Sequence, residues 1–267
     1  MDALPRNGRV GVMVWRREVM RHLRSPGRTL GALVQPILFV FVLGYGLSPT
    51  VDKVGGVPFS HFVFPGAVAL SVASTAIFAA ASTVRDREFG FLREMLVAPV
   101  WRSTILTGKI LGAATVATLQ GILVLAIAPL VGLRLAAPNL AAALAVCMVT
   151  GLVMAGLGTW VAAGVRRIEG FQGMVQFVLF PMVFLSGALF PLDRLPGWLA
   201  LLTRLDPLTY AVDPMRRVLL QGQGERAALD AVSLLGGGIG VPHELAILGF
   251  ITALCAGGAV WELTRRE

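Results

Sequence analysis

Six long apolar segments constrain this chain more than any other feature of its sequence. A helix needs about 20 predominantly apolar residues to cross the hydrocarbon core of a bilayer. Only 14% of the 267 residues are charged, against about 25% in a typical soluble domain, and the mean hydropathy is +0.77. We therefore predict an all-α integral membrane protein with one transmembrane domain over residues 1–267. Its six spans are expected at 30–47, 60–84, 104–131, 139–165, 171–190 and 244–262.

Basic residues predict which side of the membrane each connection occupies. Sixteen Lys and Arg residues fall near the termini and in every second connection, whereas seven fall in the other connections. Cytoplasmic connections carry the excess of positive charge in membrane proteins, so both termini are expected in the cytoplasm. The net charge of +8 suits phospholipid headgroups better than nucleic acid, because it is concentrated at the segment ends. The pieces assigned to the cytoplasm are 1–29, 85–109, 166–170 and 263–267.

Residues 8–24 predict a basic amphipathic helix ahead of the first span. At about 100° per residue, four apolar side chains fall on one face and three arginines on the opposite face. Such a helix is expected to lie in the cytoplasmic membrane interface, and a plain basic tail that only directs membrane insertion is the alternative. Ser25-Pro26-Gly27 should end the helix before the first span. The apolar face holds Val12, Trp15, Val19 and Leu23, and the basic face holds Arg17, Arg21 and Arg24.

The fourth span and the loop after the fifth span carry further structural signals. Gly151-x-x-x-Ala155 permits close packing of helices, either within this chain or between subunits. The loop 191–243 is expected outside the cell and contains apolar bursts bounded by prolines, which are too short to span a bilayer. We interpret these bursts as short helices that re-enter the outer leaflet or pack on the bundle.

The sequence lacks the motifs of common catalytic and metal sites. Gly108-Lys109 has neither the earlier glycine nor the following Ser or Thr of a phosphate-binding P-loop. His243-Glu244 lacks the second histidine of a zinc protease. We therefore expect no catalytic residue, no metal and no cofactor in this chain, and we expect Cys147 and Cys255 to be buried thiols. Ionisable residues at the span ends are expected to reach water, which argues against proton-driven transport: Lys109, Glu169, Glu244 and Glu262.

The charged connection 85–103 is the segment that a membrane-spanning role leaves unexplained. On a helix, Phe89, Leu92 and Leu96 share one face, and charged side chains cover the rest. Gly90 should weaken this helix locally. A helix of this kind can dock into a groove on a partner protein. The connection can equally be a solvated loop that only obeys the rule for positive charge, and its residues alone favour neither interpretation.

Two motifs in this chain resemble those of ABC-2 type transporter permeases. "REFGFLREMLVAPVWRSTILTGK", residues 87–109, resembles the family's stretch R-E-x-G-T-L-E-R-L-L-V-T-P and the Gly-Lys that follows it. The chain departs from that pattern at Phe91, where the family has Thr, and at Arg93-Glu94, where the charge order is reversed. "FLSGALFPLDRLPGWLALLTRLDPLTYAVDPMRRVLLQG", residues 184–222, resembles the end of the fifth span and the Asn-Pro-Leu-Thr-Tyr that follows, with Asp206 in place of Asn. The most similar group is the daunorubicin-resistance-type exporters.

This resemblance implies a transporter built from several chains. It implies two permease subunits, identical or sister chains, and two ABC ATP-binding subunits that hold ATP and Mg²⁺, in the bacterial cytoplasmic membrane. Residues 85–98 would form a coupling helix that docks on the ATPase, and elements near 191–214 would form an outer gate. The implied docking residues are Arg87, Glu88, Phe89, Gly90, Leu92, Arg93, Glu94 and Leu96. The implied gate residues are Phe190, Pro191, Leu195, Pro196, Trp198, Pro207 and Tyr210.

Phenylalanines in the spans indicate a class of substrate. An apolar route suits a hydrophobic drug or a lipid, which an exporter would move out of the cytoplasm or the inner leaflet. A polysaccharide or glycolipid is the alternative, although only two Tyr and five Trp are available to stack on sugars. A membrane scaffold that recruits a soluble protein and a membrane-embedded enzyme are alternatives of other classes. The residues expected along the route are Phe39, Phe78, Phe177 and Phe184.

Overall fold

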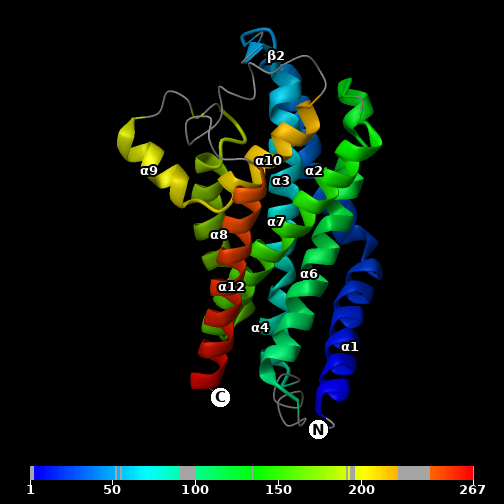
Figure 1. Cartoon of the computed structure of the whole chain (residues 1–267), viewed down its shortest axis with the longest axis vertical. Helices are drawn as coiled ribbons and strands as arrows, with labels where there is room; N and C mark the ends of the chain where they lie inside the picture. The colour runs from blue at the N-terminus through cyan, green and yellow to red at the C-terminus, as the bar shows by residue number, and fades with distance from the viewer. Residues whose placement is uncertain are drawn as a thin grey trace.

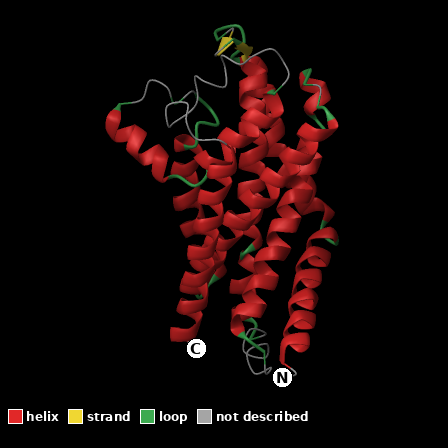
Figure 2. Ribbon diagram, viewed as in Figure 1, coloured by secondary structure: helices red, strands yellow, loops and turns green. Residues whose placement is uncertain are grey.

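Long helices run side by side along the long axis of the molecule (Figure 1). The computed structural model describes residues 3–51, 53–54, 56–90, 100–133, 135–190, 192, 196–221 and 241–266. Helices account for nearly all secondary structure in these ranges (Figure 2), which confirms the predicted all-α fold. The α-helices are α1 (Ala3–Leu23), α2 (Pro26–Leu38), α3 (Phe59–Ala79), α4 (Ala81–Glu88), α6 (Arg102–Leu125), α7 (Ala137–Gly164), α8 (Ile168–Leu185), α9 (Gly197–Leu205), α10 (Thr209–Leu220) and α12 (Val241–Arg266).

Six helical stretches in the described ranges are long and apolar enough to cross a membrane, the number that the sequence predicts. Three of them combine two elements. The first joins α2 to the π-helix η1 (Phe39–Tyr45), the second joins α3 to α4, and the third joins α6 to the 3-10 helix η2 (Ala128–Val131). The other three lie in α7, α8 and α12. The largest difference in boundary is in the fifth span, which was predicted to end at residue 190 and ends at Leu185.

The two ends of the bundle differ in structure. Both chain termini lie at one end, which we call the terminal end, and the end of α4 lies there too (Figure 1). At the opposite end, which we call the hairpin end, β1 (Lys53–Val54) pairs antiparallel with β2 (Val57–Pro58). The sequence pattern did not predict this hairpin. Short helices were predicted after the fifth span, and α9 and α10 lie there; their depth relative to a membrane stays a prediction.

Helix α3 occupies the centre of the bundle. In the most apolar window of its span 78% of the residues are buried, against 17% in the span of α2 and 22% in the spans of α8 and α12. Helix α7 packs on α3 at Gly158, where an added methyl group would lie 2.7 Å from the carbonyl oxygen of Ile77. Gly151 of α7 approaches the backbone of Ala114 of α6 in the same way. The small residues of the fourth span therefore serve helix contacts within the chain.

Helix α1 lies alongside the first half of α6 and does not cross the end of the bundle (Figure 1). From residue 7 onwards, where the side chains of α1 are described, the buried ones are Asn7, Val14 and Glu18, whereas Val12 on the predicted apolar face is exposed. Trp15 of that face is half-exposed, and its Nε1 donates a hydrogen bond to Thr115 Oγ1 of α6 (3.0 Å). A helix is therefore present as predicted, but the face that packs on α6 is a different one. That the exposed apolar face meets the membrane interface stays a prediction.

Candidate functional site: a coupling surface and a cavity at the terminal end

Helix α4 ends at Glu88, inside the segment 85–98 that was predicted to dock on a partner. The backbone N–H of Phe89 bonds to the carbonyl of Arg85 (3.0 Å), and that of Gly90 bonds to the carbonyl of Arg87 (3.1 Å). Gly90 has a φ of 78°, the left-handed conformation in which glycine commonly ends a helix. The prediction of one continuous helix over 85–98 is therefore wrong at Gly90. The remaining docking residues lie outside the described residues: Leu92, Arg93, Glu94 and Leu96.

Phe89 is the first residue after α4 and is 73% exposed at the terminal end. Single exposed apolar side chains are common on protein surfaces, so exposure alone assigns no role to it. What distinguishes Phe89 is its position in the chain. Each of the three residues before it binds a different part of the bundle.

Arg87 caps the end of α7. Its Nη1 donates hydrogen bonds to the carbonyl oxygens of Ala162 (3.1 Å), Ala163 (3.2 Å) and Val165 (2.8 Å). The last carbonyls of a helix have no partner within the helix and carry partial negative charge. A guanidinium group supplies both hydrogen-bond donors and a positive charge to these carbonyls, so Arg87 holds the end of α7 against α4.

Glu88 binds the start of the next helix, α8. Its Oε1 accepts a hydrogen bond from the backbone N–H of Ile168 (2.9 Å), the first residue of α8. Carboxylates are favourable there because the free N–H groups at a helix start carry partial positive charge. Arg87 and Glu88 therefore hold both sides of the α7–α8 connection. The sequence predicted these residues as the rim of a docking surface, and the structure gives both side chains partners within the chain.

Asp86 is the buried centre of a group of charges that joins three helices. Its carboxylate accepts hydrogen bonds from Arg17 (2.6 Å) and Arg21 (3.5 Å) of α1 and pairs with Lys109 of α6. Glu18 of α1 lies 3.3 Å from Arg17, 3.6 Å from Arg21 and 3.7 Å from Lys109. We call Arg17, Glu18, Arg21, Asp86 and Lys109 the ion-pair cluster.

The ion-pair cluster fixes α1, α4 and α6 to one another. Lys109 was predicted to reach water from the end of its span, and this prediction is wrong. Its side chain is only 2% exposed because α1 covers this part of α6.

Removing one partner of a buried ion pair typically costs about 3–5 kcal/mol, since the other charge is left without compensation. Arg24, the third arginine of the predicted basic face, is exposed just after α1.

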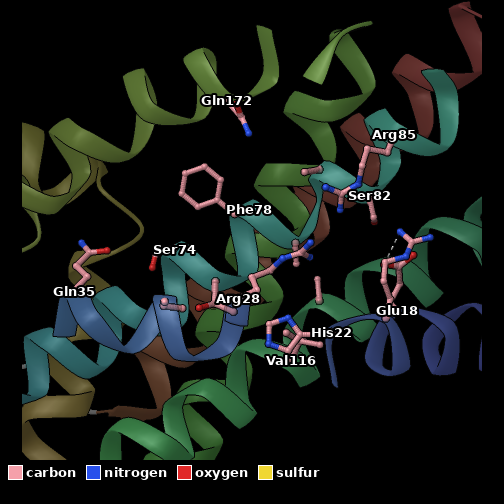
Figure 3. A pocket seen from close by; sticks show the side chains of 17 residues that line it. Glu18, His22, Arg28, Gln35, Ser74, Phe78, Ser82, Arg85, Val116 and Gln172 are labelled. Carbon is pink, nitrogen blue, oxygen red and sulfur yellow. Dashed lines mark ion pairs between the residues drawn. The ribbon is translucent and has the colours of Figure 1, made fainter. Parts of the chain in front are cut away.

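A cavity of about 480 Å³ lies beside the ion-pair cluster (Figure 3). Residues of α1, α2, α3, α4, α6 and α8 line it. Of the four phenylalanines expected along a substrate route, Phe78 lines this cavity and the other three do not. Phe177 and Phe184 are exposed on α8, and Phe39 is half-buried at the start of η1. The structure therefore does not bring the four rings together at one site.

Arg216 of α10 is fully buried towards the hairpin end. Its Nη2 donates a hydrogen bond to the carbonyl of Gly187 (2.8 Å), and its guanidinium lies 4.0 Å from the centre of the Phe62 ring. Burial lowers the pKa of Arg216 to about 10, so the side chain stays charged at neutral pH. A desolvated cation over an aromatic face gains about 2 kcal/mol. Arg216 therefore ties α10 to α3 and to the turn after α8.

The Asp-Pro-Leu-Thr-Tyr motif forms the start of α10. Asp206 accepts hydrogen bonds from the backbone N–H of Leu208 (2.9 Å) and from the hydroxyl of Thr209 (3.4 Å). These bonds satisfy donors that a helix start leaves free. Burial raises the pKa of Asp206 to about 7, and the two hydrogen bonds oppose this shift less strongly. The carboxyl group therefore exchanges its proton near neutral pH.

The predicted gate residues lie around α9 and the start of α10. The Tyr210 hydroxyl donates a hydrogen bond to the carbonyl of Arg204 (2.8 Å), which holds the end of α9 against α10. Trp198 on α9 is exposed. A gate formed by these residues stays a prediction. Of the others, Phe190, Pro196 and Pro207 lie in the connections, and Pro191 and Leu195 lie outside the described residues.

A second group of charges joins α10 to α12. Arg217 lies 2.7 Å from Asp213, one turn earlier, and 3.5 Å from Glu244 in the first turn of α12. Glu244 was predicted to reach water from the span end, and this prediction is wrong because its side chain is buried. The packing of α10 on α12 covers it.

Comparison with known proteins places the chain in a family. The sequence model of the family described as ABC-2 type transporter matches residues 11–220. The chain belongs to the ABC-2 type transporter family. Nodulation protein J of Rhizobium meliloti (strain 1021) is 34% identical over 221 residues, which cover 82% of this chain and 84% of that protein. Nodulation protein J of Rhizobium leguminosarum bv. trifolii is 33% identical over 82% of this chain and 85% of its own length.

Membership of the ABC-2 family fixes the general role of this permease. It is a multi-pass membrane protein and the non-catalytic transport component that works with an ABC ATP-binding subunit. The resemblance drawn from the two motifs is therefore confirmed. The match includes the end of α4 and the start of α10, where those motifs lie.

Sequence reasoning missed three residues that the structure makes central. Glu18 and Asp86 are each an acid among several basic residues close to a span, and that shared pattern was a usable signal of pairing. Arg216 gave no such signal. Adjacent arginines in a connection between spans are usually exposed, and only the packing of α10 on α3 reveals its burial.

Proposed function

We propose that this permease is the membrane-spanning subunit of an ATP-driven exporter in the bacterial cytoplasmic membrane, with its terminal end in the cytoplasm. Two copies, or one copy and a sister permease, would assemble with two ATP-binding subunits. Those subunits would hold ATP and Mg²⁺ and carry out hydrolysis. Phe89 and the segment that runs to Leu96 would form the surface on which the ATPase docks.

The arrangement around Phe89 is the observation that carries this proposal. An exposed aromatic residue follows three residues that bind the rest of the bundle. A force applied at Phe89 would reach α1 and α6 through Asp86, and it would reach the α7–α8 connection through Arg87 and Glu88. Packed elements respond to such a force by moving between discrete arrangements as rigid bodies. Closure of the ATPases on ATP would in this way move the inner ends of four spans together.

The cavity supports an amphiphilic substrate, either a hydrophobic drug or a lipid. Phe78 supplies an apolar surface, and the cavity lies among α2, α3 and α8 near the terminal end. Export of a glycolipid or polysaccharide is the second candidate. The side chains of Gln35, Ser74 and Gln172 favour it, because all three line the cavity and can form hydrogen bonds with hydroxyl groups.

Substitution of Phe89 tests the docking surface. We expect Phe89→Ala to weaken binding of the ATPase roughly 30-fold, because an aromatic anchor at the centre of an interface contributes about 2 kcal/mol or more. The measurement is co-purification of the ATPase with the tagged permease, followed by substrate-stimulated ATP hydrolysis in vesicles. Phe250→Ala is the matched control, since Phe250 is also exposed but lies on α12 away from α4. Equal recovery of the ATPase with both variants would exclude Phe89 as the docking residue.

A further inference from the structure

The cavity beside the ion-pair cluster has a positively charged wall. Arg21, His22, Arg28 and Arg85 line it. Glu18 is the only carboxylate among the described lining residues, and it already pairs with cations of the ion-pair cluster. The wall therefore carries an excess of positive charge next to a space that is large enough for a ligand.

Arg28 and Arg85 account for this excess. Arg21 pairs with Asp86 and Glu18, but within the part of the chain that the structure describes no carboxylate lies within ion-pair distance of Arg28 or Arg85. Figure 3 shows both side chains directed into the cavity, Arg28 from α2 and Arg85 from α4. The positive charges of Arg28 and Arg21 both act on Arg85, and the carboxylates of Glu18 and Asp86 act on it in the opposite direction. Arg28 is exposed and Arg85 is half-buried. Like charges that share one cavity wall repel each other, and an anion bound between them would relieve this repulsion.

His22 adds little positive charge to the wall. Burial, and to a smaller extent the charge of Arg28, lowers the pKa of His22 below its usual value. The imidazole is therefore neutral at neutral pH, and its Nε2 lies 3.1 Å from the hydroxyl of Thr29. Any anion in the cavity is consequently held by the arginines.

The remainder of the wall suits an amphiphile. Phe78, Ala32 and Val116 are apolar, and the ring of Phe78 lies beside the space in Figure 3. Arg28 belongs to the first turn of α2 and Arg85 to the last turn of α4. Each arginine therefore lies at the end of its span that is nearer to the terminal end of the bundle. Basic pockets between spans on the cytoplasmic side bind lipid headgroups, and the proposed function places the terminal end on that side.

We propose that the cavity binds an amphiphile whose phosphate-bearing headgroup has a net negative charge, with Arg28 and Arg85 as its ligands and Phe78 against the start of its chains. This site deepens the proposed function and rests on it. Guanidinium groups match phosphate oxygens with two parallel hydrogen bonds. The volume of about 480 Å³ falls in the range of ligand pockets, roughly 300–1,000 Å³. Inorganic phosphate shares the headgroup chemistry, and it lacks the chains that Phe78 would contact.

Binding of short-chain lipids to the complex of permease and ATPase tests the site. The complex is placed in phosphatidylcholine nanodiscs, and fluorescent dioctanoyl phosphatidic acid is the probe. Unlabelled dioctanoyl phosphatidic acid, dioctanoyl phosphatidylcholine and inorganic phosphate compete with it. We expect phosphatidylcholine and inorganic phosphate each to compete at least tenfold more weakly than phosphatidic acid. Equal competition by phosphatidylcholine would overturn the anionic site, and equal competition by inorganic phosphate would overturn the contact with the chains.

Variants of the two arginines complete the test. Arg28→Gln combined with Arg85→Gln should weaken binding of phosphatidic acid about 100-fold, since each lost charged hydrogen bond is worth about tenfold. Arg28→Lys combined with Arg85→Lys keeps the charge but loses the paired hydrogen bonds, so it should bind phosphatidic acid more tightly than the Gln double variant and less tightly than the unchanged permease. Arg16→Gln, which removes an exposed arginine of α1 outside the cavity, should leave binding unchanged. Unchanged binding in the Gln double variant, with the ATPase still co-purifying, would refute the headgroup site and leave the proposed transport function standing.

Discussion

The ion-pair cluster of the terminal end and Arg216, which lies towards the hairpin end, hold buried charge in different ways. At the terminal end, the carboxylate of Asp86 faces cations from two other helices, and each charge of the ion-pair cluster has an opposite charge beside it. Towards the hairpin end, Arg216 rests on a carbonyl oxygen and an aromatic ring. Its Nε and Nη1 atoms have no hydrogen-bond partner among the described atoms.

This difference indicates how each end can move. A group of mutually paired charges resists separation, because parting any one of them strands another in a poorly solvated place. A cation held by neutral groups can exchange one carbonyl for another without leaving a second charge behind. We therefore expect the helices joined by the ion-pair cluster to move as one piece when an ATPase binds, and we expect the contacts of Arg216 with α3 and with the turn after α8 to rearrange at lower cost.

Removing one charge from each end gives the largest expected effect and tests the comparison directly. Asp86→Asn should lower the free energy of unfolding by about 3 kcal/mol or more, because Lys109 stays buried with a weakened set of partners. Arg216→Met should cost only about 1–2 kcal/mol, because the groups in direct contact with its guanidinium are a carbonyl and an aromatic ring. Thermal or denaturant unfolding of both variants in the same detergent provides the measurement. Equal losses in the two variants would contradict the comparison.

A pH titration should act on the start of α10 through Asp206. The pKa of Asp206 is about 7 in the folded chain, against about 4 in an unfolded chain. The folded state binds this proton more tightly than the unfolded state does. The contribution of the protonated carboxyl group to the free energy of unfolding is therefore complete below about pH 4 and is lost as pH rises through 7. Stability should fall by on the order of a few kcal/mol across that window. Hydrogen exchange at the start of α10 should accelerate over the same range.

Asp206→Asn is the control for the titration. The amide keeps an oxygen that can accept the hydrogen bond from Leu208, but it does not titrate. The variant should therefore lose the dependence on pH between about 4 and 7 while keeping the start of α10 intact. A variant with an unchanged pH profile would show that another group is responsible.

Glu88→Ala should give the smallest loss of stability. It separates the contact of α4 with α8 from the contacts that the ion-pair cluster makes with α1 and α6. The loss of its bond to Ile168 should cost about 1 kcal/mol, the usual value of a helix cap. Hydrogen exchange should accelerate at the first amides of α8 and stay unchanged in α1 and α6, because the ion-pair cluster is untouched. Glu169→Ala removes an exposed carboxylate from the same turn of α8 and serves as the control. An equal change in the two variants would mean that Glu88 acts only through its charge.

The parts of this structure that depend on local sequence could be predicted. The six spans follow from the length and polarity of consecutive residues, and the two motifs identify the family. The end of α4 was partly predictable, since Gly90 was expected to weaken a helix. The left-handed backbone of Gly90 ends α4 completely. This ending depends on the hydrogen bonds that the backbone N–H groups of Phe89 and Gly90 make to the preceding turn.

The contacts between helices could not be predicted from periodicity. The pattern in α1 singled out an apolar face, but the face that packs on α6 includes Gly11 and Glu18. Two glycines of α6 decide this. A methyl group at Gly108 would lie 2.8 Å from the carbonyl of Gly11, and one at Gly112 would lie 2.7 Å from the side chain of Glu18. Periodicity shows which residues share a face, but it does not show which neighbour leaves room for that face.

The order of Arg87 and Glu88 has a mechanical consequence. The end of α7 is negative and the start of α8 is positive, and α4 presents a positive and then a negative side chain to them. Successive residues of a helix are about 100° apart around its axis, so a rotation of α4 by one residue would bring the wrong charge to each helix end. The connection therefore resists torsion of α4 while it accepts thrust along the helix axis. An ATPase that pushes on Phe89 would deliver a linear stroke to α7 and α8, and a twisting motion at the same point would meet an electrostatic stop.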